Sequence, residues 1–564
     1  MAGHCFFRRR KQAGIRIDMI YEEKKNGGFS TVLFLVAVFL LTVSPWALEL
    51  RSLYWNEGTF AAIVREIASF PPLLTLHGES ASGVFPLYPL IVKIIHSCGF
   101  SMEFSLRIVP VIALAVLASI VWLCCYRASG LQAAAAGTAV MISSMIIIDK
   151  GLEGNPVLLT ALGIFACWLI WFDLGAWRGE WGFAWLASGL VAGLLFYTAG
   201  WQGLFMTVVP LLFLRRPLTL WAKPRGPGFV FAVGLILLFI LAWGLPRWHA
   251  GFAGAFRPDY ASPEGTGTYL VQLLVFPFEA AFRLLPWSIF AWAPFCPAII
   301  QLDKNPLLGK YLRTLFVVMF CILWFSPETE GRDIVCLVPP LAVLIGLNYW
   351  IAVRRYGMRY LLLFKIAGIA ALICGIGALL FCLLPADLLQ KLPLTRDLAY
   401  RNDPFLGLFG TIYCSAAVLL SLLSLFLARK DVPIWKLGLL VFSSFILIYW
   451  GAVVPYKAAL HTRRDMGLEL RKALGGNTDD LTIYKYNTLA GLYPECHYMG
   501  GRIVTVKNAS ELPSGEKVIY VLAPEVPSVP DRAWRSLLNR EYRNQRLALW
   551  RGELRENEND EQEN

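Results

Sequence analysis

The sequence predicts a polytopic α-helical membrane protein with a small α/β domain after its last membrane helix. Hydrophobic residues make up 57% of the 564 residues and charged residues only 16%, whereas soluble domains carry about 25% charged residues. The mean hydropathy is +0.57. Apolar runs of about 18–25 residues recur along the chain, which is the length that crosses about 30 Å of hydrocarbon.

The net charge of +12 predicts contact with membrane lipids and no nucleic-acid partner. The basic residues are spread over short loops instead of forming one face. Such a distribution is typical of topology signalling and of attraction to anionic headgroups.

The N-terminal residues 1–30 form a basic segment that we expect in the cytoplasm. The apolar run that follows, at about 29–50, is too long for the core of a signal peptide and lacks a small-residue cleavage site. We therefore interpret this run as the first helix of a transmembrane domain that covers residues 31–454.

A first outer loop is expected at 51–104. It contains an amphipathic stretch, Phe60 to Phe70, and an apolar stretch, Phe85 to Ile95, that is short for a full crossing. We expect both to form juxtamembrane helices on the outer surface. The alternative, in which the second stretch spans the membrane, inverts all later loops and breaks the excess of positive charge on the inside.

The later apolar runs bring the expected total to about thirteen transmembrane helices. In this arrangement the last helix ends outside, so the C-terminal domain is extracytoplasmic. The expected helices after the first cover residues 105–126, 131–148, 155–174, 183–198, 201–214, 228–246, 284–301, 311–326, 333–353, 361–385, 405–428 and 434–453.

The C-terminal domain is expected at 455–552 with mixed helices and strands. A helix from Lys457 to Leu474 ends at Gly475-Gly476, a common C-cap. The tail 553–564 is acidic and is expected to be disordered. Short β-type runs are expected at Leu481–Tyr486, Arg502–Val506, Lys517–Leu522 and Arg546–Trp550, and a further helix at Asp531–Asn539.

Three polar clusters fall on the outer side of the membrane in this topology. They are Trp55–Gly58, Asp149–Pro156 and Glu328–Asp333. Each one alone is what a solvated loop at a helix end looks like, but their shared location favours a functional site. A carboxylate there can act as general base on an acceptor, and a lysine or arginine can hold a lipid-linked phosphate.

Several short motifs resemble those of the lipid-linked-sugar glycosyltransferases of the GT-C fold, the aminoarabinose transferases and protein O-mannosyltransferases. The resemblance runs from the first helix through the C-terminal domain and depends on the order and spacing of the motifs. The motifs are Trp55-Asn56-Glu57-Gly58, Ile63–Ile67, Leu76-His77-Gly78, Phe85–Leu90, Leu106–Pro110, and Ser326 with Arg332 and Val338-Pro339-Pro340.

This resemblance implies an integral membrane enzyme that moves a single sugar from a polyprenyl-phosphate donor to a lipid, glycan or protein acceptor on the outer face. It also implies a multi-pass protein of the bacterial inner membrane. Through the matching motifs it implies that Arg107 and Tyr88 contact the substrate. The reaction requires no cofactor, although a divalent metal is compatible with it, and His77 is the one weak metal candidate.

The chain departs from the family pattern at its acids and lysines. Asn56 and Asn155 stand where the family has aspartates, and the family lysines are absent near Val84 and in Thr198–Trp201. An asparagine amide cannot act as a general base.

Three hypotheses follow. Glu57 takes over as base, with Glu153 or Asp149 as second acid and Lys150 or Arg332 on the phosphate. Alternatively, the protein is a catalytically degenerate relative that binds a lipid-linked sugar or a partner. It could also be a transporter or flippase of a lipid-linked substrate, although we see no matched pair of broken helices.

Overall fold

The computed structural model describes residues 31–32, 34–40, 51–67, 74–81, 83–219, 226–251, 266–327, 329–384, 404–430, 432–455, 463–478, 480–489, 491–543 and 545–555. The basic segment 1–30 and most of the expected first helix lie outside these residues, as does most of the tail 553–564. The described residues form two compact units. The first contains 107–241 and 266–455, and the second contains 51–106, 242–251 and 463–555.

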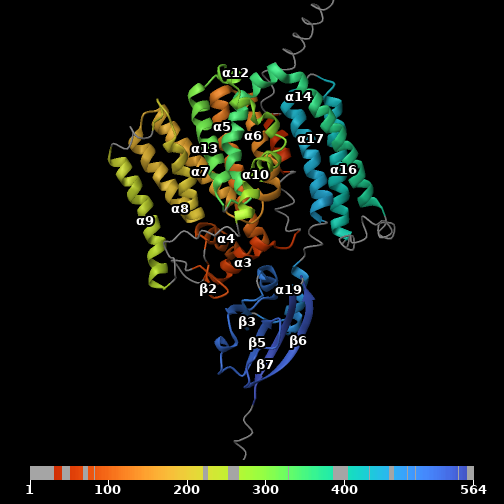
Figure 1. Ribbon diagram of the computed structural model, residues 1–564. Helices are drawn as coiled ribbons and strands as arrows, with labels where there is room; N and C mark the ends of the chain where they lie inside the picture. Colours follow the sequence, from red (N-terminus) through yellow and green to blue (C-terminus); the bar gives the residue numbers. More distant parts are fainter. Residues whose placement is uncertain are drawn as a thin grey trace, which may run out of the picture. The chain divides into compact units, whose positions relative to one another are not determined.

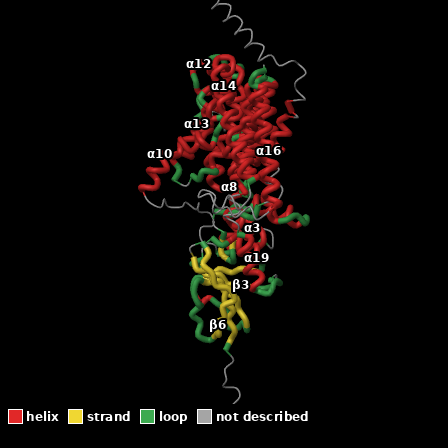
Figure 2. The backbone as a smooth tube through the Cα atoms, turned by 90° about the vertical axis from the view of Figure 1, so that its right-hand side faces the viewer, coloured by secondary structure: helices red, strands yellow, loops and turns green. Residues whose placement is uncertain are grey.

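The first unit is a bundle of apolar helices (Figures 1 and 2). In the described part of the chain, eight helices are long and apolar enough to cross a membrane, or nine if one sharply bent pair is a single span. The protein is therefore a multi-pass membrane protein, as predicted. The helices are α5 (Met102–Ser129), α6 (Leu131–Ser143), η1 (Ile147–Gly151), α7 (Val157–Ile170), η2 (Trp171–Trp177), α8 (Trp181–Leu212), α9 (Pro227–His249), α10 (Thr266–Arg283), α11 (Ser288–Ala291), η4 (Ala293–Phe295), α12 (Pro297–Ile300), α13 (Pro306–Phe325), η5 (Asp333–Leu337), α14 (Val338–Leu383), α16 (Pro404–Leu427), α17 (Ile434–Ile448) and η7 (Tyr449–Val453).

Helix α8 consists of two arms that meet at Gly200, where φ is 59° and ψ is −141°. A Cβ atom on Gly203 would lie 3.0 Å from Leu195 Cγ, a distance that a straight helix does not allow. The two arms therefore fold back on each other, and they correspond to the separate helices predicted at 183–198 and 201–214. Glycine at position 200 permits the positive φ of this turn.

Two helix predictions are wrong. The stretch 284–301 is broken into the short helices α11, η4 and α12, because Pro286, Pro294 and Pro297 remove backbone donors. The long apolar helix in this region is instead α10, which bends by 107° into the residues that follow it.

Helix α14 runs unbroken through the interruption predicted between 353 and 361. Its 46 residues measure about 69 Å at 1.5 Å per residue, more than twice the hydrocarbon thickness of about 30 Å. Arginine is a good helix former, so Arg354, Arg355 and Arg359 do not end the helix.

The second unit contains the loop segment 51–106 and the C-terminal domain. The loop provides α3 (Trp55–Glu66), the two-residue strands β1 (Thr75–Leu76) and β2 (Glu79–Ser80), and α4 (Leu87–Ser97). Both stretches expected to be helical in this segment contain a helix, and the 11 residues of α4 measure about 16 Å, too short to cross a bilayer. Phe60 of α3 packs edge-on against Tyr88 of α4, with ring centroids 5.0 Å apart.

The C-terminal domain is a five-stranded mixed sheet in the order β4-β3-β5-β7-β6 (Figure 1). Strand β3 is parallel to β4 and β5, and the β6–β7 hairpin is antiparallel at the other side. Helices α19 and α20 pack on one face through Leu470, Cys496 and Met499. The elements are α19 (Arg464–Ala473), β3 (Thr482–Tyr486), α20 (Tyr493–Met499), β4 (Arg502–Val506), η8 (Ala509–Glu511), β5 (Val518–Ala523), β6 (Arg532–Tyr542) and β7 (Gln545–Leu554).

The four predicted strands are present, and Gly475 and Gly476 end α19 with positive φ angles of 95° and 87°. The predicted helix at Asp531–Asn539 is wrong, because the residues from Arg532 onward belong to the edge strand β6. Strand β6 pairs with β7 along most of its length. That tertiary pairing overrides a local pattern that is ambiguous between helix and strand.

Candidate functional site

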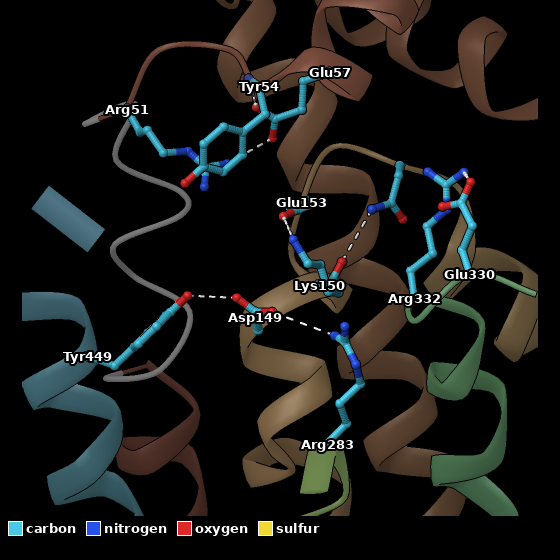
Figure 3. Close-up of polar contacts among 11 residues, drawn as sticks. Arg51, Tyr54, Glu57, Asp149, Lys150, Glu153, Arg283, Glu330, Arg332 and Tyr449 are labelled. Atoms are coloured by element: carbon cyan, nitrogen blue, oxygen red, sulfur yellow. Dashed lines mark hydrogen bonds and ion pairs between the residues drawn. The ribbon is translucent and has the colours of Figure 1, made fainter. Parts of the chain in front are cut away.

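Asp149 accepts a hydrogen bond from the Tyr449 hydroxyl, with 2.6 Å between the oxygens (Figure 3). Its other oxygen lies 3.8 Å from Nη1 of Arg283, and the Asp149 side chain is 27% exposed. Asp149 lies in η1, Tyr449 in η7 and Arg283 at the end of α10. Three separate helices thus bring one acid, one cation and one hydroxyl together.

Arg283 also pairs with Glu279, one helical turn before it, at 2.7 Å. Gly331 packs against this pair, since a Cβ atom there would lie 2.5 Å from Arg283 Nη2 and 2.7 Å from Glu279 Oε1. The absence of a side chain at Gly331 therefore allows the loop before η5 to pack against Arg283. This loop is the third polar cluster, so it lies beside the acids around Asp149.

Lys150 forms an ion pair with Glu153 at 3.0 Å, and their side chains are 37% and 10% exposed. Asn155 stabilises this turn from within. Its amide nitrogen donates to the Lys150 carbonyl at 3.2 Å, and its amide oxygen accepts from the Val157 backbone nitrogen at 3.0 Å. Asparagine side chains commonly bond the backbone two residues onward. Asn155, only 1% exposed, thus shapes the loop that presents Lys150.

Arg332 pairs with Glu330 through two contacts, of 2.6 Å and 2.9 Å. The Arg332 side chain is 28% exposed and that of Glu330 is 57% exposed. This exposed pair can exchange its carboxylate for a phosphate at little cost, because surface ion pairs are weak. Glu328 of the same predicted cluster lies outside the described residues.

Glu57 is buried in the second unit, with 1% exposure. One oxygen accepts from Arg51 Nη2 at 3.3 Å and the other from the Tyr54 backbone nitrogen at 3.0 Å (Figure 3). The Arg51 guanidinium stacks 3.3 Å from the centre of the Tyr54 ring. Glu57 thus caps the first turn of α3, a common role for a carboxylate at this position. The neighbouring Asn56 is partly exposed.

Arg107 and Tyr88 are both buried. Arg107 is 1% exposed and lies in the second turn of α5. The Tyr88 hydroxyl donates to the Leu106 carbonyl at 2.8 Å. Tyr88 therefore attaches α4 to the start of α5, next to Arg107.

His77 lies at the turn between β1 and β2 with a positive φ of 54° and is 2% exposed. Burial, with a smaller contribution from Lys485, lowers its pKa to about 3. Within the described ranges, no three His, Cys, Asp or Glu side chains come together in a group that could hold a metal ion.

Sequence reasoning missed Arg51, Arg283 and Tyr449. Arg51 directly follows the first apolar run. A cation at such a membrane boundary is a candidate functional residue, so its position could have identified it. Arg283 lies at the end of α10. The polar residues Gln272 and Glu279 interrupt the apolar pattern of this helix, so it was not predicted from the sequence. Tyr449 resembles an ordinary interfacial aromatic residue in sequence.

The whole chain can now be compared with known proteins. No protein-family model and no curated protein sequence matches it. The solved structure of ArnT from Cupriavidus metallidurans in the apo state matches with a TM-score of 0.65 and 13% identity, covering 92% of this chain and 97% of that one. ArnT from the same organism bound to undecaprenyl phosphate matches with a TM-score of 0.64 and 15% identity, covering 93% and 98%.

An apo oligosaccharyltransferase from Archaeoglobus fulgidus also matches, over 87% of this chain and 66% of that one, at 12% identity. Its TM-score is 0.39, and no inference depends on it. The two ArnT structures cover both units, from the helical bundle to the C-terminal sheet. The chain therefore has the GT-C fold of the lipid-linked-sugar glycosyltransferases that its motifs resemble.

Proposed function

We propose that this protein is an integral membrane glycosyltransferase that moves a single sugar from a polyprenyl-phosphate donor to an acceptor on the outer face of the membrane. The observation that carries the proposal is the fold likeness over more than nine-tenths of the chain to an ArnT structure that holds undecaprenyl phosphate. The membrane is the bacterial inner membrane, with the N-terminus in the cytoplasm and the C-terminal domain outside.

Asp149 is the general base of the proposed reaction. Its carboxylate is about a quarter exposed, so an acceptor hydroxyl can reach it. The carboxylate takes the proton of that hydroxyl while the acceptor oxygen bonds to the sugar carbon and the bond from that carbon to the phosphate oxygen breaks. The Tyr449 hydroxyl and Arg283 orient the carboxylate through the contacts at 2.6 Å and 3.8 Å.

Lys150 holds the departing phosphate. Its side chain is 37% exposed and follows Asp149 directly in the chain. An ammonium group there stabilises the negative charge that the polyprenyl phosphate gains as it leaves. Arg332 is a second cation for the same donor, released from Glu330 when the phosphate arrives.

Glu57 is the alternative base. Both of its oxygens already accept hydrogen bonds, from Arg51 and from the Tyr54 backbone. Its side chain is only 1% exposed, whereas that of Asp149 is 27% exposed, so an acceptor hydroxyl reaches Asp149 more readily. We therefore assign the base to Asp149 and a positioning role in the loop before α3 to Glu57.

The test is a transfer assay with the full chain purified in detergent, given radiolabelled polyprenyl-phosphate sugars and total membrane acceptors. Asp149→Asn should lower transfer at least a hundredfold, since it removes the base and keeps the shape. Asp173→Asn is the matched control, because Asp173 also lies in a π-helical segment and pairs with Arg178 at 3.0 Å. Transfer that survives Asp149→Asn and disappears in Glu57→Gln returns the base to Glu57.

The catalytically degenerate relative is the second candidate. Asn155 favours it, because its amide fills a structural role where the family has an acid. Donor binding without transfer from any donor would support this relative. A protein that neither transfers nor retains donor, but moves labelled lipid across proteoliposome membranes, would be a transporter.

A further inference from the structure

Two cysteines from separate helices meet beside η7. Cys382 lies near the end of α14 and Cys414 lies in α16. These two helices pack side by side at one edge of the bundle (Figure 1). The Cys414 side chain is hydrogen-bonded to that of Cys382. Both residues are in the thiol form, so their sulfur atoms are in contact without a covalent bond.

Two glycines bring this cysteine pair against η7. A Cβ atom on Gly410 of α16 would lie 2.6 Å from the Gly451 carbonyl oxygen and 3.2 Å from Cys382 Sγ. A Cβ atom on Gly451 would lie 3.0 Å from Cys414 Sγ. Cys382 Sγ is also 4.0 Å from the Gly451 carbonyl oxygen. Both sulfur atoms therefore border the same close approach of α16 to η7.

Most buried cysteines in a helical bundle are small packing residues. Cys125 and Cys167 fit this description, because their thiols donate to backbone carbonyls of neighbouring helices at 3.9 Å and 3.5 Å. A thiol that faces a carbonyl cannot form a covalent bond with it. Cys382 and Cys414 instead face each other from two helices, which is the arrangement that a disulfide needs.

We propose that Cys382 and Cys414 form a reversible disulfide that joins α14 to α16 beside η7. Cys382 is partly buried and Cys414 is 0% exposed, so an external disulfide, on a protein or a small molecule, reaches Cys382 first. The Cys382 thiolate attacks that disulfide and releases one thiol, and the Cys414 thiolate then attacks the Cys382 sulfur and releases the second. The two cysteines lose two electrons and two protons, and the oxidant becomes two thiols.

The cysteine pair is connected to the candidate site through η7. Gly451 lies two residues after Tyr449, whose hydroxyl donates to Asp149 at 2.6 Å (Figure 3). Bond formation brings the sulfurs to about 2.05 Å, which changes the packing around Gly451 and shifts Tyr449 relative to Asp149. The effect on transfer rests on the proposed function, in which this end of the bundle faces the periplasm, a compartment that favours disulfides.

The first measurement detects the disulfide itself. The full-length protein in neutral detergent is equilibrated with mixtures of reduced and oxidised glutathione. The remaining thiols are blocked with N-ethylmaleimide, and the protein is then unfolded, digested and analysed by mass spectrometry. We expect a peptide pair linked through Cys382 and Cys414 that increases with oxidised glutathione and disappears with dithiothreitol. If this linked pair is missing at every glutathione ratio, the proposal is wrong.

Single variants test the order of attack. Cys414→Ser lacks the second thiol, so glutathione should stay attached to Cys382. Cys382→Ser should show no linked pair and no glutathione on the buried Cys414. Cys374→Ser is the matched control, because Cys374 is an exposed thiol of the same helix, and it should form the linked pair as the wild type does. A linkage that requires Cys374 contradicts the assignment.

Thermal unfolding shows whether the folded protein accommodates the bond. The oxidised wild type should unfold at a higher temperature than the reduced form, because the cross-link constrains the unfolded chain. Cys374→Ser should show the same rise and Cys382→Ser none. An oxidised form that unfolds at or below the temperature of the reduced form contradicts a disulfide in the native fold. Cys382→Ser, at a partly exposed helix end, keeps this test available if Cys414→Ser does not fold.

The transfer assay then tests the connection to Tyr449. The oxidised wild type should transfer sugar several-fold more slowly than the reduced form, and dithiothreitol should restore the rate. Cys382→Ser should have one rate under both conditions. Equal rates in both forms of the wild type, with the linked pair present, retain the disulfide and remove its effect on the site. A linked pair in a protein that transfers under neither condition retains the disulfide and removes the glycosyltransferase.

Discussion

The Tyr498 hydroxyl accepts a hydrogen bond from the Leu53 backbone nitrogen at 2.9 Å and donates one to Glu103 Oε1 at 2.9 Å. Leu53 precedes Tyr54, whose own nitrogen bonds Glu57. A single side chain on α20 therefore fixes the segment that leads into α3 and the candidate acid Glu57. The C-terminal domain thus contacts the loop that contains α3 directly, within the second unit.

Tyr498→Phe should destabilise this unit by about 1–3 kcal/mol, because it leaves the buried Leu53 nitrogen and the Glu103 carboxylate without their shared partner. The change is measured by thermal unfolding of the purified protein. Tyr520→Phe is the matched control, since no hydrogen bond of the Tyr520 hydroxyl is found among the described residues. Equal effects of the two variants would contradict the role of Tyr498.

Gly58→Ala should destabilise the packing of α3 against α20. A Cβ atom there would lie 2.5–2.6 Å from the Pro494 ring and its nitrogen, which forces the two helices apart. Overpacking of this kind costs about 1–3 kcal/mol. Gly515→Ala, which meets no atom within 4 Å in the same unit, is the control and should unfold at the wild-type temperature.

Stability of the second unit should fall as the pH drops from about 6.5 towards 4. Burial lowers the pKa of His77 to about 3, with help from Lys485. Burial also lowers the pKa of His497 to about 4; Arg65 and His96 add to this effect and Glu103 opposes it. Both folded pKa values lie below the unfolded value of 6.5. The unfolded state therefore binds more protons in this window, and folding weakens as pH falls.

The expected slope is at most about 1.4 kcal/mol per pH unit for each histidine. It is measured by chemical unfolding between pH 4 and 7.5. His77→Asn tolerates the positive φ at this turn, and in combination with His497→Gln it should flatten the profile. A profile as steep in the double variant as in the wild type would assign the effect to other groups.

Tyr449→Phe should lower the transfer rate about tenfold, which corresponds to about 1.4 kcal/mol in the activation barrier. It removes the hydroxyl that orients Asp149 and leaves the ring in place. Tyr413→Phe in the same unit is the control, because its ring stacks on Phe409 and its hydroxyl has no hydrogen bond in the described part of the chain. A full rate in Tyr449→Phe would remove the oriented carboxylate from the mechanism.

The features that sequence could predict depend on local patterns. Apolar runs of membrane length identified α5, α7, α9, α13, α16 and α17, and alternating apolar residues identified four strands of the sheet. The prediction of a helix at 284–301 was wrong because hydropathy takes no account of the backbone N–H donors that Pro286, Pro294 and Pro297 lack. Strand β6 was predicted as a helix because its strand conformation depends on pairing with β7, which local sequence does not show.

The candidate site could also be predicted only where local sequence patterns reveal it. Asp149 and Lys150 could be found, because charged residues between apolar runs are costly and stand out. Their partners could not, because Tyr449 and Arg283 come from distant helices and reach Asp149 only in the folded bundle. The structural role of Asn155 was also hidden. The sequence shows that the family's acid is missing at this position, but it does not show the two backbone groups that the Asn155 amide binds.

The composition of the second unit has a consequence for biosynthesis. Leu53 and Tyr498 are 445 residues apart in sequence. At about 5–20 residues per second, the ribosome adds the second about 20–90 s after the first. During this time α3 and the β1–β2 hairpin exist without the sheet and the helix α20 that bury them. The loop thus keeps its apolar side chains exposed until about the last eighth of the chain is made. A premature stop before that point would leave this segment near the N-terminus without its packing partners.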